Sequence, residues 1–211
     1  MAVAQRAGAD GRVWLVRHAS TAWTGRRFCG RTDMPLSTEG RREAAALADR
    51  LAAIVPDDVL VVSAPTARAR ETAEWLVASL RGQGRVECDD RLREVDFGRA
   101  EGLTFDRLAE TMPDLAAGLA AGEPIDWPGG ESAASVRKRA ADVWLDVRRA
   151  GRPGLLVTHG GFVRALLEVA FGRPALADVW IGPGAVVELA GIGRRWQIVS
   201  VESTSQGSGR D

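Results

Sequence analysis

The chain has 211 residues, of which 45% are hydrophobic and 27% are charged, the proportions of a soluble globular protein with one buried core. Its 28 basic and 28 acidic residues give zero formal charge, so no overall field attracts nucleic acid or an anionic membrane, and we predict neither as a partner. Little charge repulsion opposes self-association, so the composition is compatible with a homodimer.

No apolar run reaches the roughly 18 residues that a membrane span requires, and Met1–Gly11 lacks the apolar core of a secretory signal. The two cysteines, Cys29 and Cys88, have neither the number nor the spacing of a disulfide framework or a zinc site. We therefore expect both to be thiols in a cytoplasmic protein.

The two ends of the chain differ in composition from its middle. Residues 1–11 and 203–211 are rich in alanine, glycine, serine and polar residues, which predicts two disordered tails. Residues 12–202 contain no linker-like run, no low-complexity block and no fixed-period repeat, so we predict one domain there.

Short apolar runs alternate with amphipathic ones along this domain. In chain order they predict a strand over Val13–Val16, a helix over Thr38–Ile54 capped by Ser37, a strand over Asp58–Val62, a helix from Pro65 to about Leu80, a short strand over Arg85–Cys88, helices over Thr104–Ala121 and Ser132–Ala150, a strand over Gly154–Thr158, a helix over Gly161–Phe171, and strands over Ala185–Ala190 and Arg195–Val201. This alternation predicts an α/β fold, a three-layer α/β/α sandwich around a mostly parallel sheet.

Ligands of such sheets bind beyond the carboxyl ends of the strands. That rule selects three places, each directly after a predicted buried strand: Arg17-His18, Ser63–Arg68 and His159-Gly160. Two structural histidines at strand ends are the alternative. A metal site is a weak interpretation, because two histidines without a defined carboxylate partner are an incomplete ligand set.

The residue types at these places suit phosphoryl transfer. A guanidinium such as Arg17 or Arg68 offers a rigid fork of donors that matches phosphate oxygens. A neutral imidazole can attack phosphorus and carry the group covalently. A leaving alkoxide also needs a proton, for which Glu94, Asp96 and Glu101 are candidates that spacing alone does not separate.

The chain resembles the histidine phosphatase superfamily, the phosphoglycerate mutase-like proteins. The motifs that carry the resemblance follow the family's order over roughly residues 12–200. The first three are Leu15-Val16-Arg17-His18-Ala19-Ser20-Thr21, then Gly30 with Asp33-Met34-Pro35-Leu36-Ser37 and Gly40, and then Ser63-Ala64-Pro65-Thr66-Ala67-Arg68-Ala69 with Thr72. The last three are Leu92-Arg93-Glu94 with Phe97-Gly98 and Glu101-Gly102, then Pro128-Gly129-Gly130-Glu131-Ser132, and then Val157-Thr158-His159-Gly160-Gly161.

The resemblance implies a role for each matching position. His18 would be the nucleophile that becomes phosphohistidine, and Glu94 would be the proton donor. Four positions would bind the phosphoryl group or lie beside it: Arg17, Arg68, His159 and Gly160. Gly30 lies in the loop that follows the nucleophile motif, and because Arg26 and Arg31 are in the same loop, either arginine could meet a second anionic group of the substrate. The family needs no metal and no organic cofactor.

Four positions depart from the usual family pattern. Ala19 and Ser20 replace a glycine and a glutamate after the histidine, and alanine there occurs in a branch that includes small phosphohistidine phosphatases. Thr24 stands where many members have an asparagine that touches phosphate, and its hydroxyl can still donate. Ala100 replaces a common tryptophan, which would open that wall of the site.

The segment Phe97–Thr104 resembles the phosphatase branch, including α-ribazole phosphatase-like and broad-specificity members, and lacks the features of glycolytic mutases. We therefore predict a phosphatase that acts on a small phosphorylated metabolite. A phosphoglycerate mutase and a non-catalytic phosphate-binding module are the alternatives. Trp23 and Trp127 lie in loops expected near the leaving group, whereas the run Arg137-Lys138-Arg139 is expected to be a solvated face.

Overall fold

The computed structural model describes residues 11–80, 85–150, 152–173, 179–193 and 195–203. Within them, six strands and six helices follow one another in the order β1 (Gly11–Arg17), α1 (Thr38–Ala52), β2 (Leu60–Ser63), α2 (Ala67–Ser79), β3 (Val86–Cys88), α3 (Phe105–Thr111), α4 (Pro113–Ala120), α5 (Ala133–Ala150), β4 (Gly154–Thr158), α6 (Gly160–Phe171), β5 (Val186–Ile192) and β6 (Arg195–Glu202). No helix in this part of the chain is both long and apolar enough to cross a membrane.

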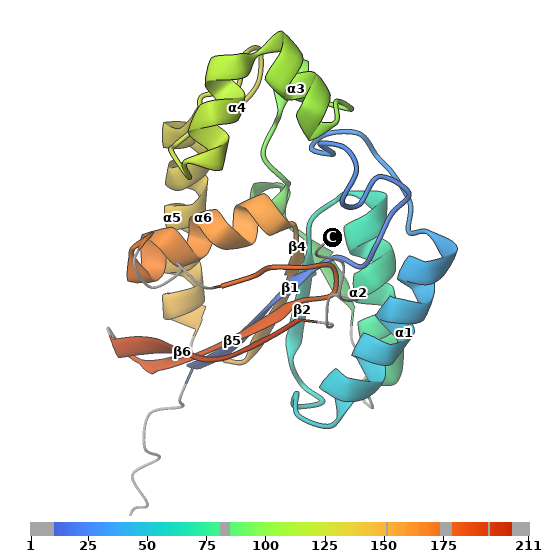
Figure 1. Cartoon of the computed structure of the whole chain (residues 1–211). Coiled ribbons are helices and arrows are strands. Elements are labelled where there is room, and N and C mark those ends of the chain that lie inside the picture. The colour runs from blue at the N-terminus through green and yellow to red at the C-terminus, as the bar shows by residue number, and fades with distance from the viewer. Residues whose placement is uncertain (1–10, 81–84, 151, 174–178, 194, 204–211) are drawn as a thin grey trace, which may run out of the picture.

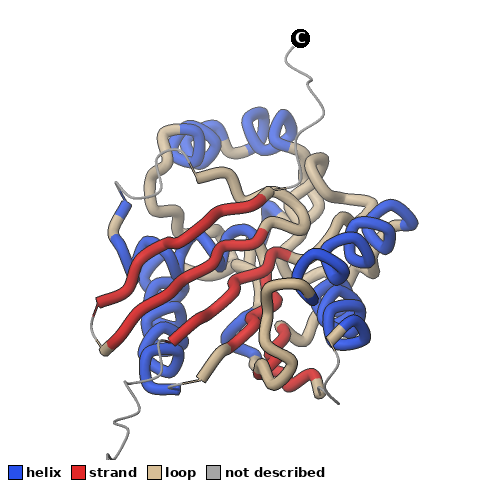
Figure 2. Tube along the Cα trace, turned by 90° about the horizontal axis from the view of Figure 1, so that it is seen from below, coloured by secondary structure: helices blue, strands red, loops and turns tan. Residues whose placement is uncertain are grey.

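The six strands form one sheet in the order β3-β2-β4-β1-β5-β6. The pairs β3-β2, β2-β4 and β4-β1 are parallel, and β5 and β6 complete the sheet as antiparallel strands. Helices α1 and α2 cover one face and α5 and α6 cover the other (Figures 1 and 2). The predicted three-layer sandwich with a mostly parallel sheet is therefore confirmed.

The central strands β1 and β4 are buried on both faces, which explains why their sequences are continuous apolar runs and do not alternate. Trp14, Leu15 and Val16 are at most 1% exposed, as are Leu155 and Val157 of β4. The main core lies around these strands and between the two helical layers. The edge strand β6 alternates between exposed and partly buried positions instead.

Two predicted helices differ from the structure at a proline. The region predicted as one helix over Thr104–Ala121 is two helices, since Pro113 has no N–H to continue α3 and holds Met112 at φ −141° and ψ 64°, outside the helical region. Pro65 precedes α2 and is not its first residue, because Thr66 with extended backbone is the N-cap. The predicted cap of α1 is confirmed, since the Ser37 side chain accepts a hydrogen bond from the Gly40 N–H.

The predicted tails lie outside the described residues except for Gly11, which begins β1, and Ser203, which is exposed after the end of β6. Cys29 and Cys88 are both free cysteines, as predicted.

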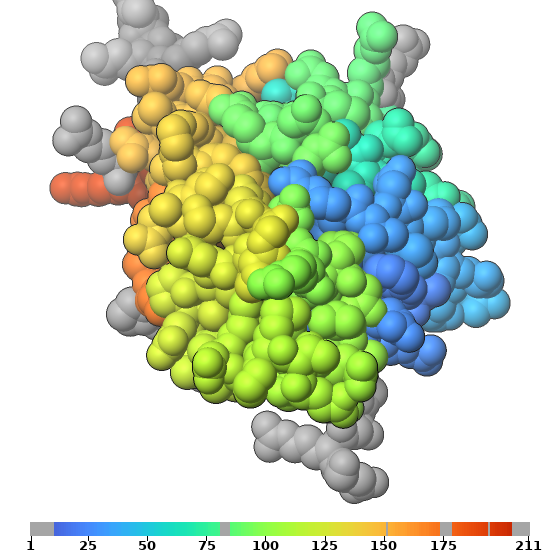
Figure 3. All heavy atoms as spheres, turned by 90° about the horizontal axis from the view of Figure 1, so that it is seen from above, coloured from blue at the N-terminus to red at the C-terminus, as the bar shows by residue number. Residues whose placement is uncertain are grey.

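Helices α3 and α4 lie above the carboxyl ends of the strands (Figure 1), and they carry part of a second, smaller hydrophobic cluster. Its buried members are Val95, Ala100, Leu108, Ala116, Trp127 and Val136. Seen from above, the green and yellow segments that follow Glu94 lie against the blue segment that follows His18 (Figure 3). The segment that holds this cluster therefore forms a cap over the edge of the sheet where ligands are expected.

The first turn of α1 packs directly against the backbone that follows His18. The Ser37 N–H donates to the Ser20 carbonyl over 3.0 Å, and a Cβ on Gly40 would lie 1.9 Å from that same oxygen. Glu43, two turns from the cap, accepts from the Ser20 N–H and hydroxyl over 2.8 and 2.9 Å. Helix α1 thus fixes the loop that begins at the predicted nucleophile.

We expect Gly40→Ala to destabilise the protein although alanine is the better helix former. Helix propensity alone would favour alanine by about 1 kcal/mol, but the overlap with the Ser20 carbonyl is with backbone and cannot be relieved by a side-chain rotation. Urea unfolding of the variant should show a lower free energy of unfolding than the parent. A stability equal to or above that of the parent would contradict this packing.

Candidate active site

His18 follows β1 directly and is 6% exposed. Its backbone N–H donates to the Thr158 carbonyl of the neighbouring strand β4 over 2.9 Å. Its side-chain Nδ1 lies 2.7 Å from the Ala19 carbonyl oxygen, which can only accept a hydrogen bond. Nδ1 therefore carries the proton of the neutral ring, and the lone pair that can attack an electrophile is on Nε2.

His159 occupies the equivalent place after β4, because β1 and β4 pair in register with Arg17 opposite Thr158. The two imidazole centroids are 5.0 Å apart with an interplanar angle of 65°. His159 is fully buried, its Nε2 is 3.2 Å from the Thr66 hydroxyl, and its Nδ1 has no protein partner in the described part of the chain. The sheet register thus brings the two predicted histidines together.

Arg17 lies beside this pair, where its Nη1 donates to the Ile181 carbonyl over 2.7 Å. Its buried Nε has no hydrogen-bond partner among the residues that the structure describes. A Cβ on Gly160 would be 3.3 Å from that Nε, so the glycine lets the guanidinium lie close to the N-terminus of α6. Gly160 therefore shapes the site through its missing side chain.

Arg68, in the first turn of α2, is fully buried and holds the loop that follows the first histidine. Its Nη1 donates to the Thr32 carbonyl over 2.7 Å, and its Nη2 donates to the carbonyls of Cys29 and Gly30 over 3.1 and 2.9 Å. Because a guanidinium has five N–H donors, two remain for another acceptor, and the partnerless Nε is one of them.

The same loop is anchored from its other side by Glu101. This carboxylate accepts the backbone N–H groups of Gly30 over 3.0 Å, of Thr32 over 3.1 Å and of Arg31 over 3.3 Å. A Cβ on Gly30 would lie 2.3 Å from the Val95 carbonyl oxygen, so only glycine fits there. In this structure the Gly30 amide is therefore engaged with Glu101, and the glycine serves the close packing of two loops.

Arg31 and Thr24, two further predicted contacts of the substrate, also have protein partners. Arg31 lies on the surface, with its Nε 3.5 Å from an Asp96 carboxylate oxygen and its Nη2 3.9 Å from Glu131. The Thr24 hydroxyl accepts the Thr21 N–H over 2.8 Å. Asp96 also accepts the Gly98 N–H over 3.0 Å within its own turn. Asp96 and Glu101, two of the three candidate acids, thus accept backbone N–H groups and keep the loops around them in place.

Glu94 is the candidate acid that reaches the histidines' end of the sheet. It is 7% exposed, and its carboxylate accepts the N–H groups of Val95, Gly161 and Phe162 over 2.9 to 3.1 Å. Two of these donors, the N–H groups of Gly161 and Phe162, are in the first turn of α6. A long-range contact that spacing does not show therefore separates Glu94 from its neighbours.

Arg139 on α5 positions the backbone that carries Glu94. Its guanidinium donates to the carbonyls of Arg91 over 2.8 Å, of Arg93 over 2.7 Å and of Glu94 over 3.2 Å. Glu131 holds it by two 2.8 Å hydrogen bonds, and it lies 4.7 Å above the Phe162 ring. Burial acts to raise the pKa of Glu131, but hydrogen bonds from Arg139 outweigh it and the pKa is lowered.

The expectation of a solvated Arg137-Lys138-Arg139 face is therefore wrong for Arg139. Helical spacing could have revealed this, since Val136, Ala140 and Val143 form the buried face of α5 and position 139 lies on the same side. Arg137 and Lys138 are exposed as predicted.

The electrostatics of the site follow from burying several cationic groups together. Burial, followed by the charges of Arg68 and Arg17, lowers the pKa of His18 well below its usual value. Burial and then the neighbouring His18 lower the pKa of His159 in the same way. Burial also lowers the pKa of Arg17, partly offset by Glu94. Both imidazoles are thus held neutral, which is the form in which a histidine is a nucleophile.

A cleft of about 600 Å³ opens beside Arg17, Glu94 and Gly160 and runs toward α4, α5 and α6. Trp127 lies in its wall, as hypothesised, whereas the ring of Trp23 faces Gly102. Within the described residues, no group of three or more His, Cys, Asp or Glu side chains could hold a metal ion.

Residues 13–204 match the family model of the histidine phosphatase superfamily, branch 1. The chain belongs to this superfamily.

It is 33% identical over 204 residues to "Probable phosphoglycerate mutase GpmB" of Cronobacter sakazakii, covering 85% of this chain and 92% of that protein. A mycobacterial glucosyl-3-phosphoglycerate phosphatase has a similar structure, with a TM-score of 0.77, 29% identity and coverage of 90% of this chain and 97% of that one. A phosphoglycerate mutase from Thermus thermophilus has a TM-score of 0.68, 31% identity and coverage of 92% and 99%. The family resemblance inferred from the motifs is confirmed, and its neighbours include both phosphatases and mutases.

The stability of the protein should fall as the pH is lowered from 7 to 5. Because folding lowers the pKa values of His18 and His159, the unfolded chain binds protons below about pH 6.5 that the folded chain does not. Each histidine then contributes a slope of up to about 1.4 kcal/mol per pH unit, with stability rising as pH rises.

This is measured by urea unfolding at pH 7, 6 and 5. A double variant His18→Asn, His159→Asn contains no histidine and should lose most of the slope. An unchanged slope in the double variant would contradict the buried neutral state of the two rings.

We expect Arg139→Ala to lower the free energy of unfolding by about 1–3 kcal/mol, since it removes the donor to three carbonyl groups and the main partner of the Glu131 carboxylate. Arg137→Ala is the matched control on the same helix, because Arg137 is exposed and a surface change there costs within about 0.5 kcal/mol. Equal denaturation midpoints for the two variants would refute the positioning role of Arg139.

Proposed function

We propose that this protein is a phosphatase that hydrolyses a small phosphorylated metabolite through a phosphohistidine on His18. The observation that carries the proposal is the tautomer of His18, whose Nδ1 is committed to the Ala19 carbonyl so that Nε2 keeps its lone pair. This nitrogen belongs to a buried group of two arginines and a second histidine, with a carboxylate and a cleft beside it. A nucleophile, a set of anion-binding donors and an acid are the three components that phosphoryl transfer requires.

The first step transfers the phosphoryl group to the protein. The His18 Nε2 attacks phosphorus, the bond from phosphorus to the ester oxygen breaks, and Glu94 gives its proton to the departing oxygen. The donors that stabilise the charge are the two free N–H groups of Arg68, the Nε of Arg17 and the Nδ1 of His159, each buried without another acceptor in the described residues. A phosphoryl group supplies the oxygens that these groups need.

The second step returns the nucleophile. Water attacks the phosphohistidine, Glu94 accepts a proton from that water, and inorganic phosphate leaves with the His18 ring restored. Thr24, Gly30 and Arg31 are proposed to act as neighbours of the substrate, with Gly30 and Arg31 reaching it through the loop that Arg68 and Glu101 hold. In this proposal no metal and no organic cofactor takes part.

The phosphatase is favoured over a mutase by three observations. The segment Phe97–Thr104 follows the phosphatase branch, and a phosphatase is among the similar structures. The cleft beside Glu94 gives a departing alcohol and an incoming water room to exchange. A mutase is the second candidate, because the curated relative from Cronobacter sakazakii bears that name. A non-catalytic module is disfavoured, since all five residues of the proposed machinery are present: Arg17, His18, Arg68, Glu94 and His159.

The test is turnover of p-nitrophenyl phosphate and a panel of metabolite phosphates between pH 4 and 8, with His18→Ala as the blank. We expect release of inorganic phosphate by the parent and a loss of at least about 1000-fold in the variant, because the step has no other nucleophile. Rapid quenching with a labelled substrate should trap an acid-labile phosphate on His18.

The mutase candidate is tested in parallel. Interconversion of 3- and 2-phosphoglycerate that depends on a bisphosphate primer, without net phosphate release, would replace the phosphatase proposal. Label on a residue other than His18 would refute the assigned nucleophile.

A further inference from the structure

The cleft beside Glu94 identifies where the alcohol part of the substrate lies, given the proposed function. A proton donor must contact the oxygen that departs, and Glu94 and Arg17 are both in the lining of the cleft. The alcohol attached to that oxygen therefore extends into the remaining volume. This volume, about 600 Å³, is in the range of pockets that enclose ligands with several rings and exceeds the need of a three-carbon alcohol.

One wall of the cleft is a cluster of three aromatic rings, Phe28, Phe97 and Trp127. Their centroids are 5.4 Å apart for Phe28 and Phe97, 5.6 Å for Phe28 and Trp127, and 4.7 Å for Phe97 and Trp127. Phe28 and Phe97 are partly buried and Trp127 is 8% exposed, so the two phenylalanines offer most of the ring surface that faces the cleft and Trp127 supports them from behind while reaching the lining with its remaining edge. The apolar side chains that continue this lining are Val95, Leu119, Pro124, Ile125, Val136, Ala165, Trp180 and Ile181.

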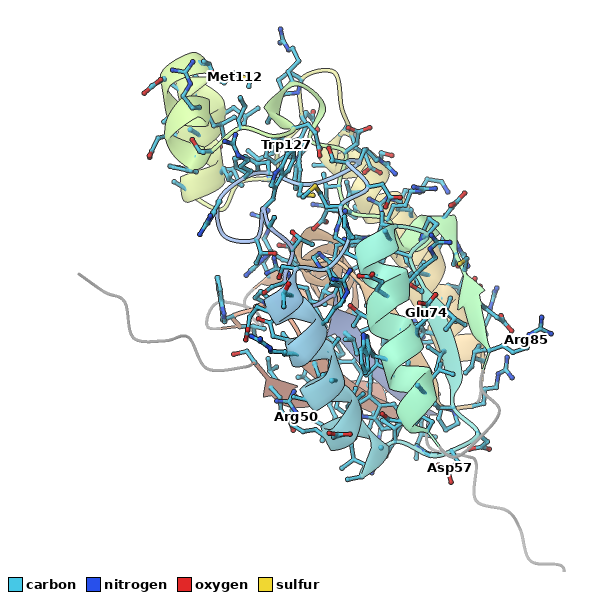
Figure 4. All side chains as sticks on the ribbon, turned by 90° about the vertical axis from the view of Figure 1, so that its right-hand side faces the viewer. Arg50, Asp57, Glu74, Arg85, Met112 and Trp127 are labelled. Atoms are coloured by element: carbon cyan, nitrogen blue, oxygen red, sulfur yellow. The ribbon has the colours of Figure 1, made fainter. Side chains whose placement is uncertain are left out.

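The aromatic wall is built before any substrate arrives, because backbone hydrogen bonds join the three segments that carry the rings. Phe28 exchanges two 2.9 Å bonds with the segment at Gly102 and Leu103, and the Arg99 N–H donates to the Pro128 carbonyl over 2.9 Å. A Cβ on Gly98 would lie 2.4 Å from the Gly130 nitrogen, so the backbones of these two loops are in direct contact there. A preformed wall costs little entropy when a ligand binds. Figure 4 shows Trp127 beneath the cap that carries Met112, at the opposite end of the molecule from Arg50 and Asp57.

The charges of the cleft nearly cancel, which favours an uncharged body for the alcohol. Its charged lining consists of Arg17, Arg137, Arg164 and Arg173 against Glu94, Glu123 and Glu168. Arg164 donates to the Val179 carbonyl and Arg173 pairs with Glu168. An anionic alcohol such as a glycerate would need a concentration of free cations, and the wall opposite the arginines is apolar instead.

We propose that the leaving group is an uncharged alcohol carrying a ring with an apolar face, held against Phe28, Phe97 and Trp127 with Trp180 at the mouth of the cleft. The shared chemistry is the flat apolar face, which an aryl group offers on its π surface and a sugar offers on its C–H side. The ring packs on the aromatic wall while the ester oxygen stays at Glu94.

The experiment compares phosphate esters that differ in the ring and not in the chemistry of the departing oxygen. Ethyl phosphate and 2-phenylethyl phosphate are both esters of primary alcohols, so their difference in kcat/KM reports binding of the ring. We expect 2-phenylethyl phosphate to be preferred by about 10- to 100-fold, mainly through KM, as the burial of one aromatic ring predicts. Glucose 6-phosphate against glycerol 3-phosphate is the matching arm for a sugar.

Three variants connect the preference to the cleft. Trp127→Leu removes ring surface from the wall, and Trp180→Ala removes it from the mouth at a side chain that is 53% exposed, where loss of folding is not expected. Both should lower the ratio of kcat/KM values between the ring-bearing and ring-free esters. Trp75→Ala is the matched control, because Trp75 is 41% exposed on α2 and is not in the lining, and it should keep the parent ratio.

Failure of this inference is distinguishable from failure of the proposed function. Turnover of ethyl and 2-phenylethyl phosphate with equal kcat/KM, or a ratio that neither Trp127→Leu nor Trp180→Ala changes, overturns the ring-binding cleft and leaves the phosphatase intact. A preference for phosphoglycerates over both ring-bearing esters also overturns it. Absence of turnover for every ester by folded protein overturns the phosphatase and, with it, the cleft inference.

Discussion

The parallel pairing of β1 with β4 puts Arg17 opposite Thr158, and the residues that follow each strand leave the sheet side by side. Side chains alternate along strands, so a shift of one position would turn the residues of one strand to the other face. This register is held by buried apolar side chains on both faces of the two strands. The contact of His18 with His159, and the approach of Gly160 to Arg17, follow from it.

Several cationic and imidazole groups lie close together in this buried place. Two features of the fold reduce the repulsion between their charges and the penalty of removing them from water. The histidines are kept neutral, because burial and nearby guanidinium charges lower their pKa values. The arginines are bound by carbonyl oxygens, three for Arg68 and one for Arg17. Partial satisfaction by carbonyl groups keeps the guanidinium groups in position and leaves donors for a phosphoryl group, which makes the site preorganised for an anion.

Glutamates around the site act as anchors of backbone. Glu43 holds the loop after the nucleophile, Glu101 holds residues 30–32, and Glu131 holds Arg139, which in turn holds the segment before Val95. Glu94 itself accepts three N–H groups and also lines the cleft. The loops around the site thus depend on charge-assisted bonds to backbone, which are stronger than neutral ones and fix geometry.

The sequence by itself determined the class of fold, the order of strands and helices along the chain, the cap at Ser37 and the placement of His18 and His159 at strand ends. These features depend on local periodicity and on the rule that ligands bind at the carboxyl ends of parallel strands. The same rule selected Arg68, and the family motifs separated Glu94 from Asp96 and Glu101. Only the tertiary structure decided that Glu101 holds the loop at residues 30–32 and that the partly buried Arg139 holds the Glu94 segment, since these contacts join residues that are far apart in the chain. It also decided the aromatic cleft, because Phe28, Phe97 and Trp127 come from three separate loops whose meeting no local pattern encodes.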